Sequence, residues 1–153
     1  MTDKSLFEKI ADNEIPSYKV WEDDKYLAFL TPFPSTPGLT VVVPKKNLGA
    51  YVFDLSDKEA AGLMTAARKV AKLLEKAMGV PKVALVFEGE GVPHVHAKLY
   101  PMHNPEVYAK GAKHHVAFYP EYPGYITTVD GPAMSEDELV AIRDRIRKAA
   151  HEG

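Results

Sequence analysis

The segment His94-Val95-His96-Ala97-Lys98-Leu99-Tyr100-Pro101 decides the fold, because polar and apolar residues alternate along it. Successive side chains of a β-strand point to opposite faces, so the alternation predicts a strand over residues 94–100. The two faces carry different sets of side chains: His94, His96 and Lys98 on one, and Val95, Ala97 and Leu99 on the other. The apolar set predicts packing against a helix, and the polar set predicts a site.

The neighbouring segments predict an α+β fold. Two capping-box spacings, Ser56 with Glu59 and Ser135 with Glu138, begin a long helix that ends at Gly79 and a second helix near the end of the chain. Apolar residues at helical spacing predict a short opening helix over residues 5–11. Apolar and aromatic runs predict four further strands, over residues 18–22, 26–31, 39–43 and 82–87.

Composition narrows the class of protein. A chain of 153 residues with 46% hydrophobic residues is large enough for one core and one domain. The formal net charge of −2 lacks the basic excess that binding to extended nucleic acid requires, and the absence of cysteine excludes disulfides and thiolate metal sites. The sequence shows neither a signal peptide nor the roughly 20 apolar residues of a membrane span. We therefore expect a cytoplasmic protein without a membrane partner.

The polar face of the predicted strand favours an anion as ligand. Its side chains stand roughly 6.5 to 7 Å apart, which suits three groups around one phosphate. A neutral imidazole is also a nucleophile when its other nitrogen is held by a hydrogen-bond acceptor. The alternatives are a solvated polar surface, or a zinc site completed by His103, His114 or His115. The ammonium of Lys98 would repel a metal ion and attract a phosphate, so we predict no metal.

Residues 94–101 resemble the signature of the histidine triad (HIT) family, with Lys98 in place of the third histidine. Several other segments resemble the same family in the same order, from about Leu6 to Pro101. These segments are Leu6-Phe7-x-x-Ile10, Glu14-Ile15-Pro16, Trp21-Glu22-Asp23-Asp24, Leu27-Ala28-Phe29-Leu30, Pro37-Gly38, Val41-Val42-Val43-Pro44-Lys45-Lys46 and Asp54-Leu55-Ser56.

The resemblance implies a mainly antiparallel five-stranded sheet and hydrolysis or transfer of a nucleoside monophosphate group. His96 falls on the nucleophile, which attacks the α-phosphorus of a dinucleoside polyphosphate or nucleoside phosphoramidate and forms a nucleotidyl-histidine without a cofactor. His94 would orient the site and Lys98 would neutralise charge. The family's homodimer is expected to bury the long helix, whose small residues permit close approach: Ala60, Ala61, Ala66, Ala67 and Ala71.

The expected partner is a purine nucleotide or a nucleotide conjugate. The resemblance places its binding site on the opening helix, the second strand and the loop before the triad, at Leu6, Phe7, Ile10, Phe29, Leu30, Thr31, Gly89, Glu90 and Gly91. An ordinary core role is the alternative for the apolar members of this set. We assign residues 1–103 to the nucleotide-binding domain and residues 104–153 to an extension that packs on it and ends in a helix.

Departures from the family pattern leave two other functions open. Leu39 and Thr31 replace polar residues of the family, and Glu90 stands in place of a glutamine. The acids Glu88 and Glu90 would repel extra phosphates, and Asn47 replaces a histidine that ligates zinc in one branch of the family. Leu39, Thr31 and Lys98 leave open a nucleotide-binding module with little turnover, and the pair His94 and His96 leaves open a metalloprotein with histidine ligands.

Overall fold

A computed structural model of the chain describes residues 3–104, 106 and 133–151. The described helices and strands are α1 (Leu6–Ala11), β1 (Tyr18–Glu22), β2 (Tyr26–Leu30), β3 (Thr40–Pro44), the 3-10 turn η1 (Val52–Asp54), α2 (Asp57–Met78), β4 (Val83–Val86), β5 (Ala97–Pro101) and α4 (Glu136–His151). None of the helices among these residues combines the length and apolar character needed to span a bilayer.

The strands form one five-stranded sheet in the order β1-β2-β3-β5-β4, and each neighbouring pair is antiparallel. Val42 in the central strand β3 lies opposite Ala28 of β2 and Ala97 of β5. The predicted α+β fold with an antiparallel five-stranded sheet is confirmed.

Helix ends follow the capping signals in the sequence. Ser5 and Ser56 are the N-caps of α1 and α2, and both make complete capping boxes with the glutamate three residues later. Gly79 ends α2 with a φ of 64°, a left-handed conformation that glycine adopts at little cost. Ser135 accepts the backbone N–H of Glu138 at the start of α4.

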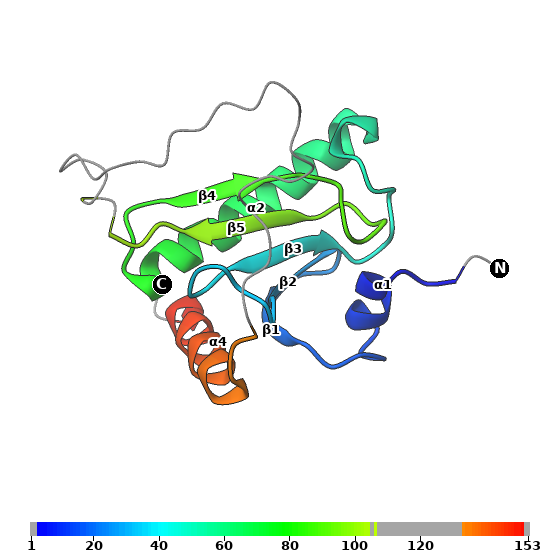
Figure 1. Cartoon of the computed structure of the whole chain (residues 1–153). Helices are drawn as coiled ribbons and strands as arrows, with labels where there is room; N and C mark the ends of the chain where they lie inside the picture. The colour runs from blue at the N-terminus through cyan, green and yellow to red at the C-terminus, as the bar shows by residue number, and fades with distance from the viewer. Residues whose placement is uncertain (1–2, 105, 107–132, 152–153) are drawn as a thin grey trace, which may run out of the picture.

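Helices lie on both faces of the sheet (Figure 1), and each face has its own apolar cluster. The helices α2 and α4 cover one face, which we call the scaffold face, and α4 contacts both α2 and β1. The short helix α1 covers part of the opposite face, which we call the site face. The buried apolar residues of the site face are Phe7, Ile10, Leu27, Phe29, Val41 and Val43. A thin apolar layer on this face leaves room for a ligand.

The strand β5 begins at Ala97, three residues later than the alternation predicts. Before Ala97 the backbone forms other hydrogen bonds: His94 N–H donates to Val92 over 2.7 Å, and Val95 N–H donates to Gly49 over 2.6 Å. The alternation of faces nevertheless holds, since Val95, Ala97 and Leu99 all belong to the buried cluster of the scaffold face. The histidines therefore occupy a short segment that leads into the strand, and His94 itself lies in a bend.

The long helix uses some of its alanines within the chain itself. Ala66 and Ala67 are buried in the scaffold cluster and Ala71 packs against it, whereas Ala61 is exposed. The packing of α4 is consistent with an extension that lies on the preceding domain. The division at residue 103 stays a prediction, because most of residues 104–132 lie outside the described part of the chain.

Candidate functional site

His96 lies just before β5 with only 4% of its surface exposed. Its Nδ1 is 2.8 Å from the backbone carbonyl of His94, which can only accept, so Nδ1 carries the proton. In the neutral ring Nε2 then holds the lone pair, and this nitrogen has no hydrogen-bond partner among the described residues. His96 also lines a cavity of about 370 Å³. The imidazole is therefore held in the tautomer that suits a nucleophile.

Burial keeps this imidazole neutral. Desolvation lowers the pKa of His96 below its usual value, and the nearby positive charge of Lys98 lowers it further, against the opposing effect of the hydrogen bond to His94. Desolvation likewise lowers the pKa of His94. Both rings are thus neutral at pH 7, so the lone pair of His96 is available there.

His94 is fully buried and does not line the cavity. Its Nε2 donates to the carbonyl of Pro44 over 2.8 Å, and its Nδ1 lies 2.7 Å from the hydroxyl of Ser5. Since both ring nitrogens have partners inside the protein, His94 cannot hold a phosphate as the sequence suggested. Only His96 and Lys98 of the three polar side chains line the cavity. A role of His94 in orientation is compatible with this placement.

Lys98 forms an ion pair with Glu88, and both side chains are largely buried, at 16% and 14% exposed. Lys98 lines the cavity, whereas its carboxylate partner Glu88 does not. Glu88 therefore neutralises a cation of the site, rather than lying in the cavity as a second repelling acid. Glu90 does line the cavity and retains that expected role.

The cavity brings together most of the residues that the resemblance assigned to nucleotide binding. Gly89 is the exception, with a φ of 71°; a Cβ there would lie 3.3 Å from the carbonyl oxygen of Ala50. The predicted residues that line the cavity are Leu6, Phe7, Ile10, Phe29, Leu30, Thr31, Glu90 and Gly91. Phe7 also packs edge-on against both histidine rings, with centroids 5.5 Å from His94 and 5.3 Å from His96. Phe7, Ile10 and Phe29 also belong to the buried cluster of the site face, so the alternative of a core role stays open for them.

The sequence analysis missed part of the cavity wall, namely Ile15, Pro16, Ser17, Tyr18, Pro32, Phe33, Val41 and Val92. Several of these residues directly precede β1 or follow β2, so their positions in the sequence could have predicted that they lie in the cavity wall. Ser17 stands out, because its hydroxyl oxygen is the one buried side-chain polar atom without a hydrogen bond in the described part of the chain. Such a group is costly to bury unpaired and is a candidate contact for a ligand.

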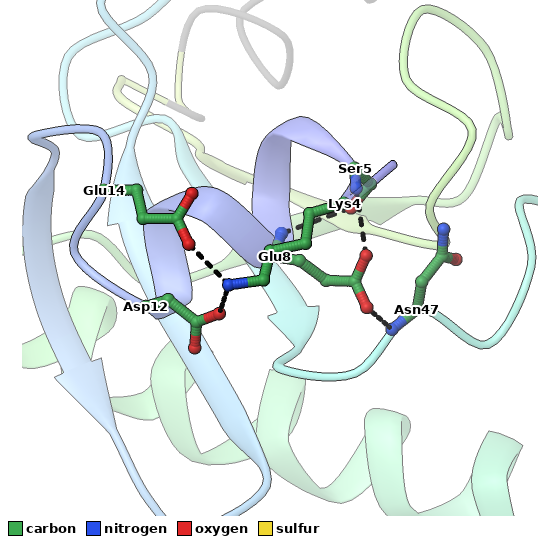
Figure 2. A network of polar contacts seen from close by, with 6 residues as sticks. All are labelled: Lys4, Ser5, Glu8, Asp12, Glu14 and Asn47. Carbon is green, nitrogen blue, oxygen red and sulfur yellow. Dashed lines mark hydrogen bonds and ion pairs between the residues drawn. The ribbon is translucent and has the colours of Figure 1, made fainter. Parts of the chain in front are cut away.

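The residues that support the histidines were also missed. Figure 2 shows the polar network at the N-terminus of α1, where the carboxylate of Glu8 accepts the backbone N–H groups of Ser5 over 2.9 Å and of Asn47 over 3.1 Å. These two hydrogen bonds lower the pKa of Glu8 below its usual range. The Ser5-x-x-Glu8 spacing was the available signal for the helix cap, but no sequence signal indicated the contact with His94.

Two of the histidines proposed as extra zinc ligands, His114 and His115, lie outside the described residues. The third, His103, donates from Nε2 to the carbonyl of Pro37 over 2.9 Å. Within residues 3–104, 106 and 133–151, no three side chains of histidine, cysteine, aspartate or glutamate come together in a way that could hold a metal ion.

The chain is similar to proteins of one family. The family model of the HIT domain matches residues 12–104. The adenosine 5'-monophosphoramidase of Schizosaccharomyces pombe is 33% identical over 147 residues, which cover 92% of this chain and 94% of that protein. A HIT-like protein of Borreliella burgdorferi is 38% identical over 71 residues, 46% of this chain and half of that protein's length.

A solved structure matches over nearly the whole chain. It is that of a HIT-like protein involved in cell-cycle regulation from Bartonella henselae, with a TM-score of 0.71 and 25% identity. The match covers 97% of each chain.

Proposed function

The chain belongs to the HIT domain family, and from this premise we propose that it hydrolyses or transfers a nucleoside monophosphate group through a nucleotidyl-His96 intermediate. The observation that carries the proposal is the tautomer of His96, whose Nδ1 is held by the carbonyl of His94 while Nε2 is free at the cavity. A nucleotide conjugate is the substrate class, and the similarity to a monophosphoramidase supports a nucleoside phosphoramidate in particular.

The reaction has two displacements at the α-phosphorus. In the first, the lone pair of His96 Nε2 forms an N–P bond while the bond from phosphorus to the leaving group breaks; the leaving group keeps that electron pair, and an amine leaving group takes a proton from solvent. In the second, water attacks the phosphorus, the N–P bond breaks and the water loses a proton to solvent. Lys98 stabilises the charge of the phosphoryl oxygens through its ammonium group.

The base and ribose would occupy the apolar part of the cavity. Phe7 and Phe29 pack on each other at 5.5 Å between centroids and form its aromatic wall, and Thr31 supplies a hydroxyl. A cavity of about 370 Å³ lies in the range of small-molecule sites. This composition suits a purine base stacked among apolar side chains.

We also propose that the protein acts as a homodimer in the cytoplasm. Exposed apolar side chains lie on α2 and just before it, with Tyr51 at 52%, Phe53 at 80% and Met64 at 49% exposed. Contact with a second copy would remove these surfaces from water. Light scattering at micromolar concentration tests this state, and a monomer there would contradict it.

The test of the reaction is intact-mass detection of a nucleotidyl adduct after brief incubation with nucleoside phosphoramidates and dinucleoside polyphosphates. We expect a phosphoramidate to give an adduct that is absent from His96→Ala. The second candidate is a nucleotide-binding module, favoured by the ion pair that engages Lys98 with Glu88. Reversible nucleotide binding without an adduct or product would support the module and overturn the enzyme.

A further inference from the structure

Ser5 has a contact that its position as a helix cap does not require. Its hydroxyl oxygen accepts the backbone N–H of Glu8 over 3.2 Å, which is the ordinary capping bond. The same oxygen lies 2.7 Å from Nδ1 of His94, a residue 89 positions later in the chain. The start of α1 is therefore joined directly to the histidine segment.

The direction of each hydrogen bond follows from the proton positions. The carbonyl of Pro44 can only accept, so Nε2 of His94 carries the proton and donates to it over 2.8 Å. Nδ1 of the neutral His94 ring then holds a lone pair, and the hydroxyl of Ser5 must be the donor over 2.7 Å. Each ring nitrogen of His94 therefore has one role, Nε2 as a donor and Nδ1 as an acceptor, which fixes the tautomer and the rotation of the ring.

The other capping boxes show that this use of the hydroxyl proton is particular to Ser5. Ser56 donates its hydroxyl proton to Glu59 over 2.6 Å, and Ser135 donates to Glu138 over 2.5 Å. In the first box the carboxylate of Glu8 instead accepts the backbone N–H groups of Ser5 and Asn47 (Figure 2). This arrangement leaves the hydroxyl proton of Ser5 for the histidine.

His94 connects this contact to the reactive group. Its side chain is held by Ser5 and Pro44, and its backbone carbonyl accepts the Nδ1 proton of His96. A rotation of the His94 ring that moved its backbone would displace this carbonyl. Such a displacement would release His96 from the tautomer that exposes Nε2.

We infer that Ser5 is a positioning residue, whose hydroxyl holds His94 and, through the carbonyl of His94, the reactive tautomer of His96. The inference rests on the proposed role of His96 as the nucleophile. It also links substrate binding to the chemistry, because Leu6 and Phe7, the next residues of α1, line the cavity. The contact of Ser5 thereby fixes the position of α1, which forms one wall of the cavity, relative to the proposed nucleophile.

The test compares three substitutions of Ser5 in the full chain. Ser5→Ala removes both the cap and the donor, Ser5→Thr keeps both, and Ser5→Asp keeps a good cap but cannot donate to Nδ1. The matched control is Ser56→Ala, which removes an equivalent capping box far from any histidine contact. Imidazole ¹⁵N NMR reports the tautomers, and steady-state kinetics with a nucleoside phosphoramidate reports kcat and KM separately.

We expect Ser5→Ala and Ser5→Asp to lose the single tautomers of His94 and His96 and to reduce kcat about tenfold, with KM changed less than about threefold. Ser5→Thr should restore the wild-type tautomers and kcat. Ser56→Ala should lose thermal stability comparable to that lost by Ser5→Ala while keeping the wild-type kcat. If Ser5→Ala unfolds, Ser5→Asp still separates the cap from the donor.

Two results would overturn the inference: wild-type tautomers in a folded Ser5→Asp protein, or a kcat for Ser5→Ala no lower than that of Ser56→Ala. The NMR readout does not need turnover. If the wild-type chain forms no adduct or product while Ser5→Asp alters both histidine tautomers, the proposed function fails and the positioning role of Ser5 stands.

Discussion

The scaffold face and the site face of the sheet share the same strands but differ in the polarity of the side chains that they bury. On the scaffold face the buried residues contributed by β5 and the segment before it are the apolar Val95, Ala97 and Leu99. On the site face the same segment buries two imidazoles, and every ring nitrogen except Nε2 of His96 has a partner among the described residues. The proposed reactive atom, Nε2 of His96, is therefore the one ring nitrogen of the two imidazoles that packing leaves without a partner among the described residues.

The largest expected effect comes from changing the site face alone. His96→Ala should reduce kcat/KM for a nucleoside phosphoramidate by roughly a thousandfold or more, because it removes the attacking atom. The protein should remain folded, since the lost ring packs at the cavity and not in the scaffold cluster. Circular dichroism checks the fold and product release checks turnover. A loss of less than about tenfold would contradict the nucleophile assignment.

The matching change on the scaffold face is Leu99→Ala. Leu99 is fully buried in the cluster beneath α2, so truncation should lower the free energy of unfolding by about 2 to 5 kcal/mol. Urea unfolding measures the change, with Arg68→Ala at an exposed position of α2 as a control expected within about 0.5 kcal/mol of wild type. Loss of activity per folded molecule as large as that of His96→Ala would show that the two faces are not separable.

A smaller effect is expected at Lys98, which lines the cavity next to the histidines. Lys98→His should raise turnover selectively, by about tenfold, on substrates whose leaving groups are basic, because an imidazole can donate a proton that an ammonium retains. It should also introduce a pH dependence near the histidine pKa. An equal loss on every substrate would mean that Lys98 itself acts as the acid.

Glu88→Gln provides the control for that substitution. It removes the carboxylate that pairs with Lys98 while keeping the shape of the side chain. A role in neutralising charge predicts tighter binding of nucleoside monophosphate, about threefold to tenfold, with stronger salt dependence. Calorimetric titration at two salt concentrations measures it. Unchanged affinity would show that Lys98 does not contact the phosphate.

The smallest expected effect is on pH dependence. Burial lowers the pKa values of His94 and His96, so at pH values between their folded pKa values and about 6.5 the unfolded chain binds more protons than the folded one. The stability that they contribute is therefore complete above about pH 6.5 and declines as the pH falls through this window. The acidic limb of kcat/KM should likewise lie below pH 6.5. An acidic limb above that pH would contradict the burial of His96.

The sequence predicted what depends on local pattern, and it failed where distant segments meet. Alternation along residues 94–100 correctly assigned Val95 and Leu99 to the core and His96 to the other face. It could not show that His94 is enclosed, because the partners that enclose it, Ser5 and Pro44, lie 89 and 50 residues away. Alternation also extends beyond a strand's hydrogen-bonded part, so it could not place the start of β5.

The charges of the site illustrate the same limit. Composition of the loop before His94 indicated that its acids would repel phosphate, and for Glu90, which lines the cavity, this stays a prediction. Glu88 differs because it forms an ion pair with Lys98 from a position two residues beyond Val86, the residue of β4 that pairs with Lys98 of β5. Ser17 gave no signal at all, since a serine before a strand is ordinary until its surroundings are known.

The packing of Trp21 allows the scaffold face to be followed by fluorescence independently of the site face. Trp21 is the single tryptophan of the chain, and it packs against the scaffold cluster with the ammonium of Lys69 on α2 lying 5.9 Å from the centre of its ring. It does not line the cavity of the site face. Its fluorescence therefore reports the integrity of the assembly of α2, α4 and β1 and is insensitive to direct contact with a nucleotide. The protein thus carries an intrinsic optical probe of its folding.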